Sequence, residues 1–151
     1  MISGLSLKPH PEGGFYVQTF RSEIDVTAPW AVRPAITSIH FMLSGDEFSS
    51  FHRLRSDEIW HHYRGAPVAI DVIEPGGRHE RMVIGKHNRW QAAIRTGSWF
   101  AAHVPVENAY ALVGCDVGPG FDFADFEIAA REALANTFPQ HRALIERWTR
   151  G

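Results

Sequence analysis

The chain has 151 residues, a formal net charge of −2 and a hydrophobic content of 44%, and these values predict one globular domain, residues 1–151, with its own core. No stretch approaches the ~18 consecutive apolar residues of a membrane-spanning helix, and the N-terminus lacks an apolar segment of the signal-peptide kind. The near-neutral charge and the absence of a basic cluster exclude nucleic-acid binding, because that binding depends on basic side chains that neutralise phosphate groups. We therefore expect no nucleic-acid or membrane partner.

The sequence contains a single cysteine, Cys115, within the apolar run ALVGCDV. One cysteine cannot form an intrachain disulfide or a cysteine-rich metal cluster. We expect a buried structural thiol, because the flanking residues are those of a core strand. Such a chain suits a reducing compartment, and we expect it in the cytoplasm.

Short β-like runs separated by Gly, Pro and Asp turns fill the first three-quarters of the sequence. We predict strands at residues 14–20, 35–43, 48–54, 58–64, 68–74, 80–85, 99–104 and 109–117. The turn-rich segments 43–46 and 74–77 are expected to join antiparallel strands. Many short strands with frequent turns predict an all-β sandwich, jelly roll or barrel.

The last quarter of the chain changes character. Residues 127–137 are rich in helix formers, and a proline at position 139 separates them from a second amphipathic segment at 141–149. The side chains expected to face the core are Ile128, Leu134, Leu144, Ile145 and Trp148. No catalytic spacing occurs in either segment, so we expect two short helices that brace the barrel.

The segment HRLRSDEIWHHYRG, which begins at His52, carries the clearest chemical pattern. Side chains alternate across a strand, so an inward His52 shares its face with Ser50, and an inward Glu58 shares its face with Trp60 and His62. A tight turn at residues 55–57 is expected to bring the histidine and the glutamate together across a hairpin.

An imidazole and a carboxyl group inside an aromatic-lined cavity supply a general base and a general acid near neutral pH. A buried hydrogen bond between the same two side chains also has a purely structural use, because it fixes a pair of strands. The sequence leaves both interpretations open.

This segment also resembles the first half of the metal motif of cupin barrels, G-x5-H-x-H-x3-4-E-x6-G. His52 and Glu58 keep the spacing of that motif, but Leu54 stands where the second His is usual. The best counterpart of the second half is RTGSWF, in which Phe100 occupies the remaining ligand position. Two ligands are too few for a tightly held zinc, iron or manganese ion, so we expect no metal and no cofactor.

Three longer segments together resemble the family Cupin-5, also called DUF985. They are HPEGGFY at residues 10–16, FHRLRSDEIWH at 51–61 with Gly65, and PGFDFADFE at 119–127. The resemblance runs in order from about residue 7 to residue 145. It implies a double-stranded β-helix, the cupin jelly roll, with short C-terminal helices and assembly as a homodimer. It carries over no catalytic residue.

The first function that these residues predict is a metal-independent enzyme acting on a small molecule, of the isomerase or epimerase type. In it His52 is the base, and Glu58 is the acid or its orienting partner. The residues expected to contact the ligand are Phe15, Tyr16, Ser50, Trp60, His62 and Phe100. The second is a non-catalytic protein that binds a sugar, nucleotide-sugar or aromatic metabolite in the same cavity. A metal-dependent oxygenase is disfavoured by the ligand count, and a purely structural role predicts a filled barrel.

Overall fold

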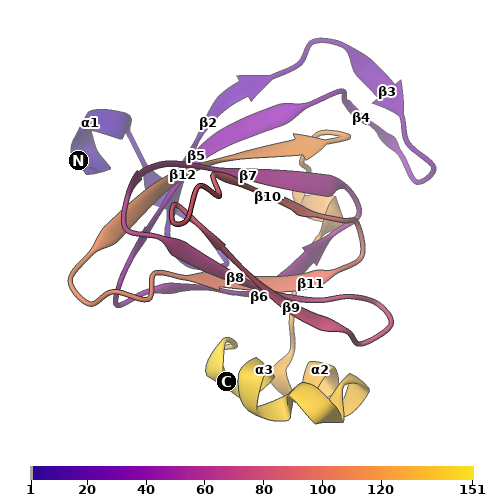
Figure 1. Ribbon diagram of the computed structural model, residues 1–151. Coiled ribbons are helices and arrows are strands. Elements are labelled where there is room, and N and C mark those ends of the chain that lie inside the picture. Colours follow the sequence, from indigo (N-terminus) through magenta and orange to yellow (C-terminus); the bar gives the residue numbers. More distant parts are fainter. Residues whose placement is uncertain (1) are drawn as a thin grey trace.

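The barrel consists of two sheets that face each other, as the computed structural model of residues 2–151 shows (Figure 1). The first sheet has six strands in the spatial order β1 (Lys8–Pro9), β2 (Phe15–Arg21), β5 (Thr37–Ser44), β12 (Tyr110–Gly118), β7 (Asp57–Gly65) and β10 (Gln91–Ile94). The second has five, in the order β13 (Phe126–Ile128), β6 (Phe48–Leu54), β11 (Trp99–His103), β8 (Val68–Ile73) and β9 (His79–Ile84). Neighbouring strands pair antiparallel, as the jelly roll expected from the sequence requires.

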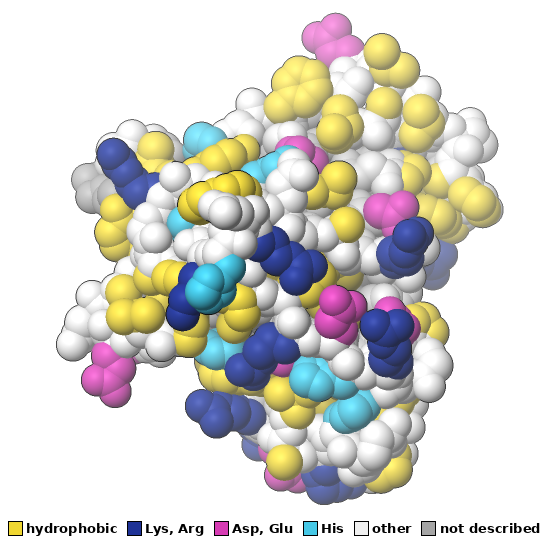
Figure 2. Space-filling model, viewed as in Figure 1, with side chains coloured by type: hydrophobic (Ala, Val, Ile, Leu, Met, Phe, Trp, Pro, Cys, Tyr) yellow, Lys and Arg dark blue, Asp and Glu magenta, His cyan; other side chains and the backbone are white. Residues whose placement is uncertain are grey.

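A hairpin arm projects from the barrel (Figure 1). It consists of β3 (Asp25–Thr27) and β4 (Val32–Pro34), which pair only with each other. Ile24 and Val32 are more than half exposed, and Figure 2 shows hydrophobic side chains exposed in this region. The arm therefore keeps apolar surface outside the barrel core.

The helical segments of the described chain are short. They are α1 (Ile2–Leu5), η1 (Phe123–Asp125), α2 (Arg131–Thr137), η2 (Pro139–His141) and α3 (Arg142–Arg147). None of these helices has the length and apolar character needed to cross a membrane.

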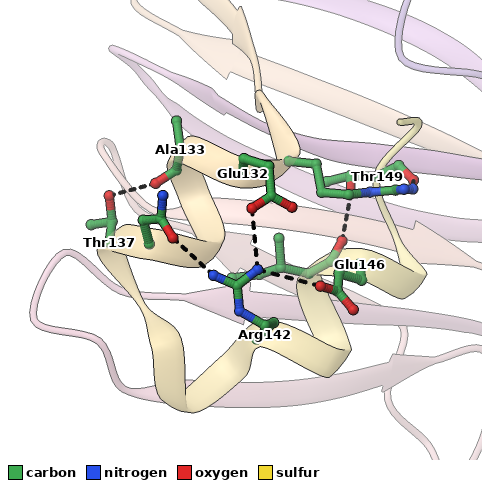
Figure 3. Close-up of polar contacts among 9 residues, drawn as sticks. Glu132, Ala133, Thr137, Arg142, Glu146 and Thr149 are labelled. Carbon is green, nitrogen blue, oxygen red and sulfur yellow. Dashed lines mark hydrogen bonds and ion pairs between the residues drawn. The ribbon is translucent and has the colours of Figure 1, made fainter.

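The helices α2 and α3 cover the outer face of the five-stranded sheet (Figure 1). Phe51 of β6 packs there against Leu134 and Ile145 in a buried cluster, so the bracing role expected from the sequence is confirmed. Arg142 joins the two helices, because its guanidinium donates to Glu132, Asn136 and Glu146 (Figure 3). The expectation that Ile128 faces the core from a helix is wrong. This residue is 42% exposed, because strand β13 continues to it and α2 begins only at residue 131.

Each of the eight strands predicted from the sequence is present, with ends that differ by at most two residues. The strands that the sequence did not predict, β1, β3, β4, β10 and β13, are two to four residues long, too short for alternation to be recognised. The turn at 74–77 joins the paired strands β8 and β9, as expected.

Two predicted hairpins are wrong. The segment 43–46 joins β5 to β6, and the segment 55–57 joins β6 to β7. In both cases the two strands belong to opposite sheets. These turns carry the chain across the barrel, so they bring together inward-facing side chains of facing sheets.

The core between the sheets occupies one part of the barrel interior. Phe41 of β5 lies opposite Val113 of β12, and both are about 1% exposed. The rings of Trp60 and Phe100 pack with them, with Trp60 lying 5.7 Å from Phe41 and 6.4 Å from Phe100 between ring centroids. Three large aromatic side chains and the aliphatic residues around them thus fill this part of the barrel.

Candidate functional site

Beyond this core, the same strands enclose a cavity of about 340 Å³. Its wall on the six-stranded sheet includes Ile39 and Thr37, which lie two and four residues before Phe41 on the same face of β5. Their partners on β12 are Cys115 and Val117, and Val117 in turn lies opposite Glu58 of β7. The cavity is therefore the continuation of the core. On β5, β12 and β7, smaller or polar side chains take the place of the large aromatic ones there.

All three segments that carry the family resemblance contribute to this cavity. The residues that they supply to its lining are His10, Glu12 and Tyr16, then His52, Leu54 and Glu58, and lastly Phe121, Phe123 and Phe126. The segments are far apart in the sequence and meet only in the folded barrel. Two carboxyl groups and two imidazoles thus share one aromatic-walled space.

Glu12 reaches this space from the loop between β1 and β2. The next residue, Gly13, has φ = +108°, and a Cβ atom there would lie 2.1 Å from the carbonyl oxygen of Phe48. Only glycine permits this close approach of the loop to β6. The loop is fixed there because the carbonyl of Glu12 accepts a hydrogen bond from Ser50 N at 2.8 Å.

The carboxylate of Glu12 forms a buried ion pair with His52. Its Oε2 atom lies 2.8 Å from Nε2 of His52, and the two side chains are 7% and 3% exposed. On the other side of the ring, Nδ1 lies 2.7 Å from the carbonyl oxygen of Ser50. A carbonyl can only accept, so Nδ1 carries a proton, and Nε2 donates the second proton to the carboxylate.

Burial opposes the charge on both partners, but their mutual attraction and hydrogen bond outweigh it. The pKa of His52 is therefore raised and the pKa of Glu12 is lowered. The pair thus consists of an imidazolium and a carboxylate near neutral pH.

Glu58 is the cavity group that gains and loses a proton near neutral pH. Burial raises its pKa to about 7, against the attraction of His52, and the negative charge of Glu12 adds to the rise. Nearby, the sulfur of Cys115 is buried as expected, and burial together with the charge of Glu58 raises the pKa of its thiol well above the usual value. This thiol therefore stays protonated, and the carboxyl group of Glu58 carries the titratable charge.

The Cupin superfamily (DUF985) family model matches residues 1–129. The chain belongs to this family. A hypothetical protein from Leishmania major is 33% identical and superposes with a TM-score of 0.94, over 99% of this chain and 97% of that one. A protein of Shewanella oneidensis is 37% identical, with a TM-score of 0.89 over 99% and 94% of the two chains.

Oxalate decarboxylase from Bacillus subtilis shares the cupin fold with this DUF985 chain. Its R92A mutant superposes with a TM-score of 0.60 at 13% identity, over 93% of this chain and 36% of that one. The likeness concerns the fold alone. No match to the chain was found among curated proteins.

In this DUF985 protein His52 and Glu58 both line the cavity, as expected, but not across a hairpin, and the hydrogen bond between them that the structural interpretation requires is not formed. Both ring nitrogens of His52 are already engaged, by Glu12 and by Ser50. The two residues face each other from opposite sheets, and they interact through their charges.

Of the residues expected to contact a ligand, Tyr16 lines the cavity and the others do not. Trp60 and Phe100 point inward as expected but lie in the filled part of the barrel. His62 is bonded through Nε2 to the carbonyl of Ala66. The two remaining residues outside the lining are Phe15 and Ser50. Strand alternation gives the face of Trp60 and Phe100 but not their depth along the barrel. Phe15 adjoins Tyr16 in β2 and so points to the opposite face, and Ser50 lies where the pairing of β6 with β11 shifts register and alternation fails.

The donor set of the cavity does not fit the metal centre of the cupin motif. Phe100 lies opposite His52 on the neighbouring strand, with the ring centroids 4.0 Å apart, so an apolar ring takes the place of a further ligand. Both nitrogens of His52 are hydrogen-bonded. Within residues 2–151, no group of three or more His, Cys, Asp or Glu side chains is arranged to hold a metal ion.

The C-terminal segment, outside the residues that the family model matches, holds the Glu12 loop in place. Arg150 donates from Nη1 to the carbonyl of Glu12 at 2.9 Å and from Nη2 to the carbonyl of Phe48 at 2.8 Å. Its guanidinium also lies 4.1 Å from the centroid of the Phe48 ring. This one side chain thus ties the loop to strand β6, on which His52 lies.

We expect Arg150→Ala to lower the free energy of unfolding by about 1–2 kcal/mol, because two charge-assisted hydrogen bonds to the backbone are lost. Urea unfolding measures this loss, and NMR titration of His52 should show a lower pKa as Glu12 becomes less well fixed. The control is Arg142→Ala, whose partners are exposed side chains and whose expected effect is within about 0.5 kcal/mol. Equal effects of the two substitutions would contradict the role given to Arg150.

Proposed function

We propose that this DUF985 protein is an enzyme that moves a proton on a small molecule bound in the cavity, with Glu58 as the group that takes up and returns the proton. The observation that carries this proposal is a buried carboxyl group with a pKa of about 7 on the cavity wall. General acid–base catalysis works best when the pKa of the group lies near the operating pH. Strongly shifted pKa values in a cavity are typical of functional sites.

In this proposal His52 is not the base that the sequence suggested. A protonated imidazole whose two N–H groups donate to Glu12 and to the Ser50 carbonyl has no lone pair to accept a proton. Its role is electrostatic, because a fixed positive charge favours the ionised form of Glu58 and any negative charge that develops on the ligand.

The cavity favours a small ligand. Its volume of about 340 Å³ is at the lower end of the range for small-molecule sites, roughly 300–1,000 Å³. A single sugar ring or a similar molecule fits that volume better than a nucleotide-sugar does. The aromatic walls suit the apolar face of such a ring, and the carboxyl and imidazole groups suit its hydroxyls.

A non-catalytic binding protein for the same class of ligand is the second candidate. The observation in its favour is the ion pair of His52 and Glu12, which uses groups that an enzyme could otherwise devote to chemistry. The two candidates differ in whether a bound ligand exchanges hydrogen atoms with the solvent.

The test begins with a thermal-shift screen of monosaccharides, their phosphates and sugar acids. A binder at a hundred times its Kd should stabilise the protein by about 2.7 kcal/mol. The binder is then incubated with the protein in D2O, and proton NMR follows the loss of its C–H signals. The enzyme proposal expects exchange with the unsubstituted protein and none with Glu58→Gln, which should still bind.

Binding without exchange supports the second candidate and overturns the first. The matched control is Glu127→Gln, because Glu127 is exposed and outside the cavity, and this variant should exchange hydrogen at the original rate. If no compound of the screen stabilises the protein, neither small-molecule proposal stands.

A further inference from the structure

We infer that His10 is the hydrogen-bond donor that polarises a carbonyl group of the ligand, and that the ligand is an α-hydroxy carbonyl compound whose proton moves between neighbouring carbons. This inference rests on the proposed role of Glu58 as the proton-transferring group and adds the second group and the substrate class. Three observations carry it: the position of His10, its tautomer, and the number of bases in the cavity.

His10 lies on the cavity wall with its ring held by aromatic neighbours. Its ring centroid is 4.7 Å from that of Tyr16, 5.7 Å from Phe126 and 5.9 Å from Phe41, all in edge-to-face geometry. A ring packed among three others has little freedom to turn. Such fixed geometry is what a group needs if it is to act on one atom of a ligand.

The tautomer of His10 follows from its hydrogen bond. The backbone N–H of Glu12 donates to Nδ1 at 3.2 Å, so Nδ1 is the acceptor of the ring and the proton resides on Nε2. The ring is neutral at pH 7, because burial lowers its pKa below the usual 6.5. The negative charge of Glu12 opposes this fall and the positive charge of His52 adds to it, and the net pKa is lowered. His10 therefore presents a neutral N–H donor, unlike the protonated His52.

A neutral imidazole N–H is suited to an oxygen that becomes negatively charged during the reaction. Its N–H group stabilises the developing negative charge by a hydrogen bond. The proton stays on the ring until the reaction begins. A carbonyl next to the carbon that is deprotonated gives such an oxygen. The donor and the base together therefore select a carbonyl compound over a plain alcohol or polyol.

The number of bases in the cavity distinguishes isomerisation from epimerisation. Glu12 is committed to His52, so Glu58 is the carboxyl group that remains for proton transfer. A single base returns the proton to the face from which it came. Inversion at one carbon needs groups on both faces, whereas a shift of the proton to the neighbouring carbon needs only one.

In the reaction the carboxylate of Glu58 takes the proton from the hydroxyl-bearing carbon. The electron pair of that C–H bond forms a carbon–carbon double bond, and the carbonyl oxygen becomes the oxygen of an enediol. His10 gives its Nε2 proton to this oxygen and regains a proton from the neighbouring hydroxyl. Glu58 then returns its proton to the former carbonyl carbon. An aldose thus becomes a ketose without gain or loss of atoms or electrons.

The first experiment needs no ligand. Nitrogen-15 NMR of the full-length protein at pH 7.5 should show a neutral His10 with its proton on Nε2, assigned by the loss of its signals in His10→Gln. The protonated form, or the tautomer with its proton on Nδ1, would overturn the role of His10.

The second experiment uses glyceraldehyde, ribose and glucose with their phosphates in D2O, with glycerol and sorbitol as controls that lack the carbonyl. We expect deuterium to enter the aldoses beside the carbonyl and the matching ketoses to appear, with no exchange in the two polyols. His10→Phe keeps an aromatic ring but removes the donor, and it should slow exchange about 100-fold. His10→Gln, which retains an N–H donor, should recover part of the rate even if the Phe variant folds poorly.

The outcomes separate this inference from the proposed function. Exchange that is lost in Glu58→Gln but unchanged in His10→Phe overturns the role of His10 and leaves the proton-transfer function intact. Exchange that persists in Glu58→Gln overturns the proposed function itself. If the unsubstituted protein exchanges hydrogen in none of the six aldoses, the substrate class is wrong.

Discussion

Glu58→Gln is expected to raise the free energy of unfolding by about 3 kcal/mol at pH 8. Burial raises the pKa of Glu58 from 4.5 to about 7, and each pKa unit corresponds to about 1.4 kcal/mol. At pH 8 the folded protein must hold an ionised carboxylate that burial disfavours, whereas the unfolded chain exposes it to water. Glutamine has nearly the same shape and no charge, so this penalty disappears.

The sign of the pH dependence follows from proton binding. The folded state binds the Glu58 proton more tightly than the unfolded state, so this group makes stability fall as pH rises from about 4.5 to about 7. The charged or titratable groups that act on it are His52, Glu12 and Cys115. His52 attracts the carboxylate of Glu58 and Glu12 repels it. Both residues are unchanged in Glu58→Gln.

Urea unfolding at pH 5 and pH 8 measures the effect. The stability of Glu58→Gln relative to the unsubstituted protein should be greater at pH 8 than at pH 5. The exposed control Glu127→Gln should shift stability by no more than about 0.5 kcal/mol at either pH. If Glu58→Gln is the less stable protein at pH 8, Glu58 is a structural group. A gain in stability on loss of the carboxylate is instead typical of a residue retained for function.

The strands were predicted well from the sequence, because the alternation of side chains and the turn residues at their ends indicate the same bounds. Strand β6 has the bounds 48–54 expected from alternation and from the turns that flank it. The same turns did not reveal that β6 and its neighbours in sequence lie in opposite sheets. The residues of a turn indicate that the chain changes direction there. They do not indicate which strand the next strand pairs with, because that depends on contacts distant in the sequence.

The candidate site was only partly predictable for a related reason. His52 and Glu58 stand in strands, where alternation gives their face. Glu12 stands in a Gly-rich loop, and only the close approach of Gly13 to β6 places its carboxylate beside His52. The segments HPEGGFY and PGFDFADFE were the available signal, because in the sequence they resembled a family and in the fold they line one cavity.

Strand β6 also offers a comparison between a buried and an exposed ion pair on adjacent residues. His52 pairs with Glu12 inside the barrel at 2.8 Å. Arg53, the next residue, pairs with Glu127 at 2.8 Å, and these two side chains are 43% and 55% exposed. The four side chains allow two double-mutant cycles with the same strand and the same distance but opposite burial.

We expect a coupling energy of about 3 kcal/mol for the buried pair at pH 6, measured with Glu12→Gln, His52→Asn and the double variant. Removing one partner leaves the other charge buried without compensation, which typically lowers stability by about 3–5 kcal/mol. The cycle of Arg53→Gln and Glu127→Gln should give less than about 1 kcal/mol, because water screens the exposed pair. Comparable coupling energies for the two pairs would show that the buried one is not an ion pair.

The pH dependence of the cycle identifies the charged forms. The pKa of Glu12 is lowered below its usual 4.5, so its contribution is complete above that pH and is lost as pH falls through the lowered value. The pKa of His52 is raised above its usual 6.5, so its contribution is complete below that pH and is lost as pH rises through the raised value. The coupling should therefore be greatest between about pH 4.5 and 6.5. A coupling energy that stays constant up to pH 9 would indicate a neutral hydrogen bond and would return His52 to the role of a base.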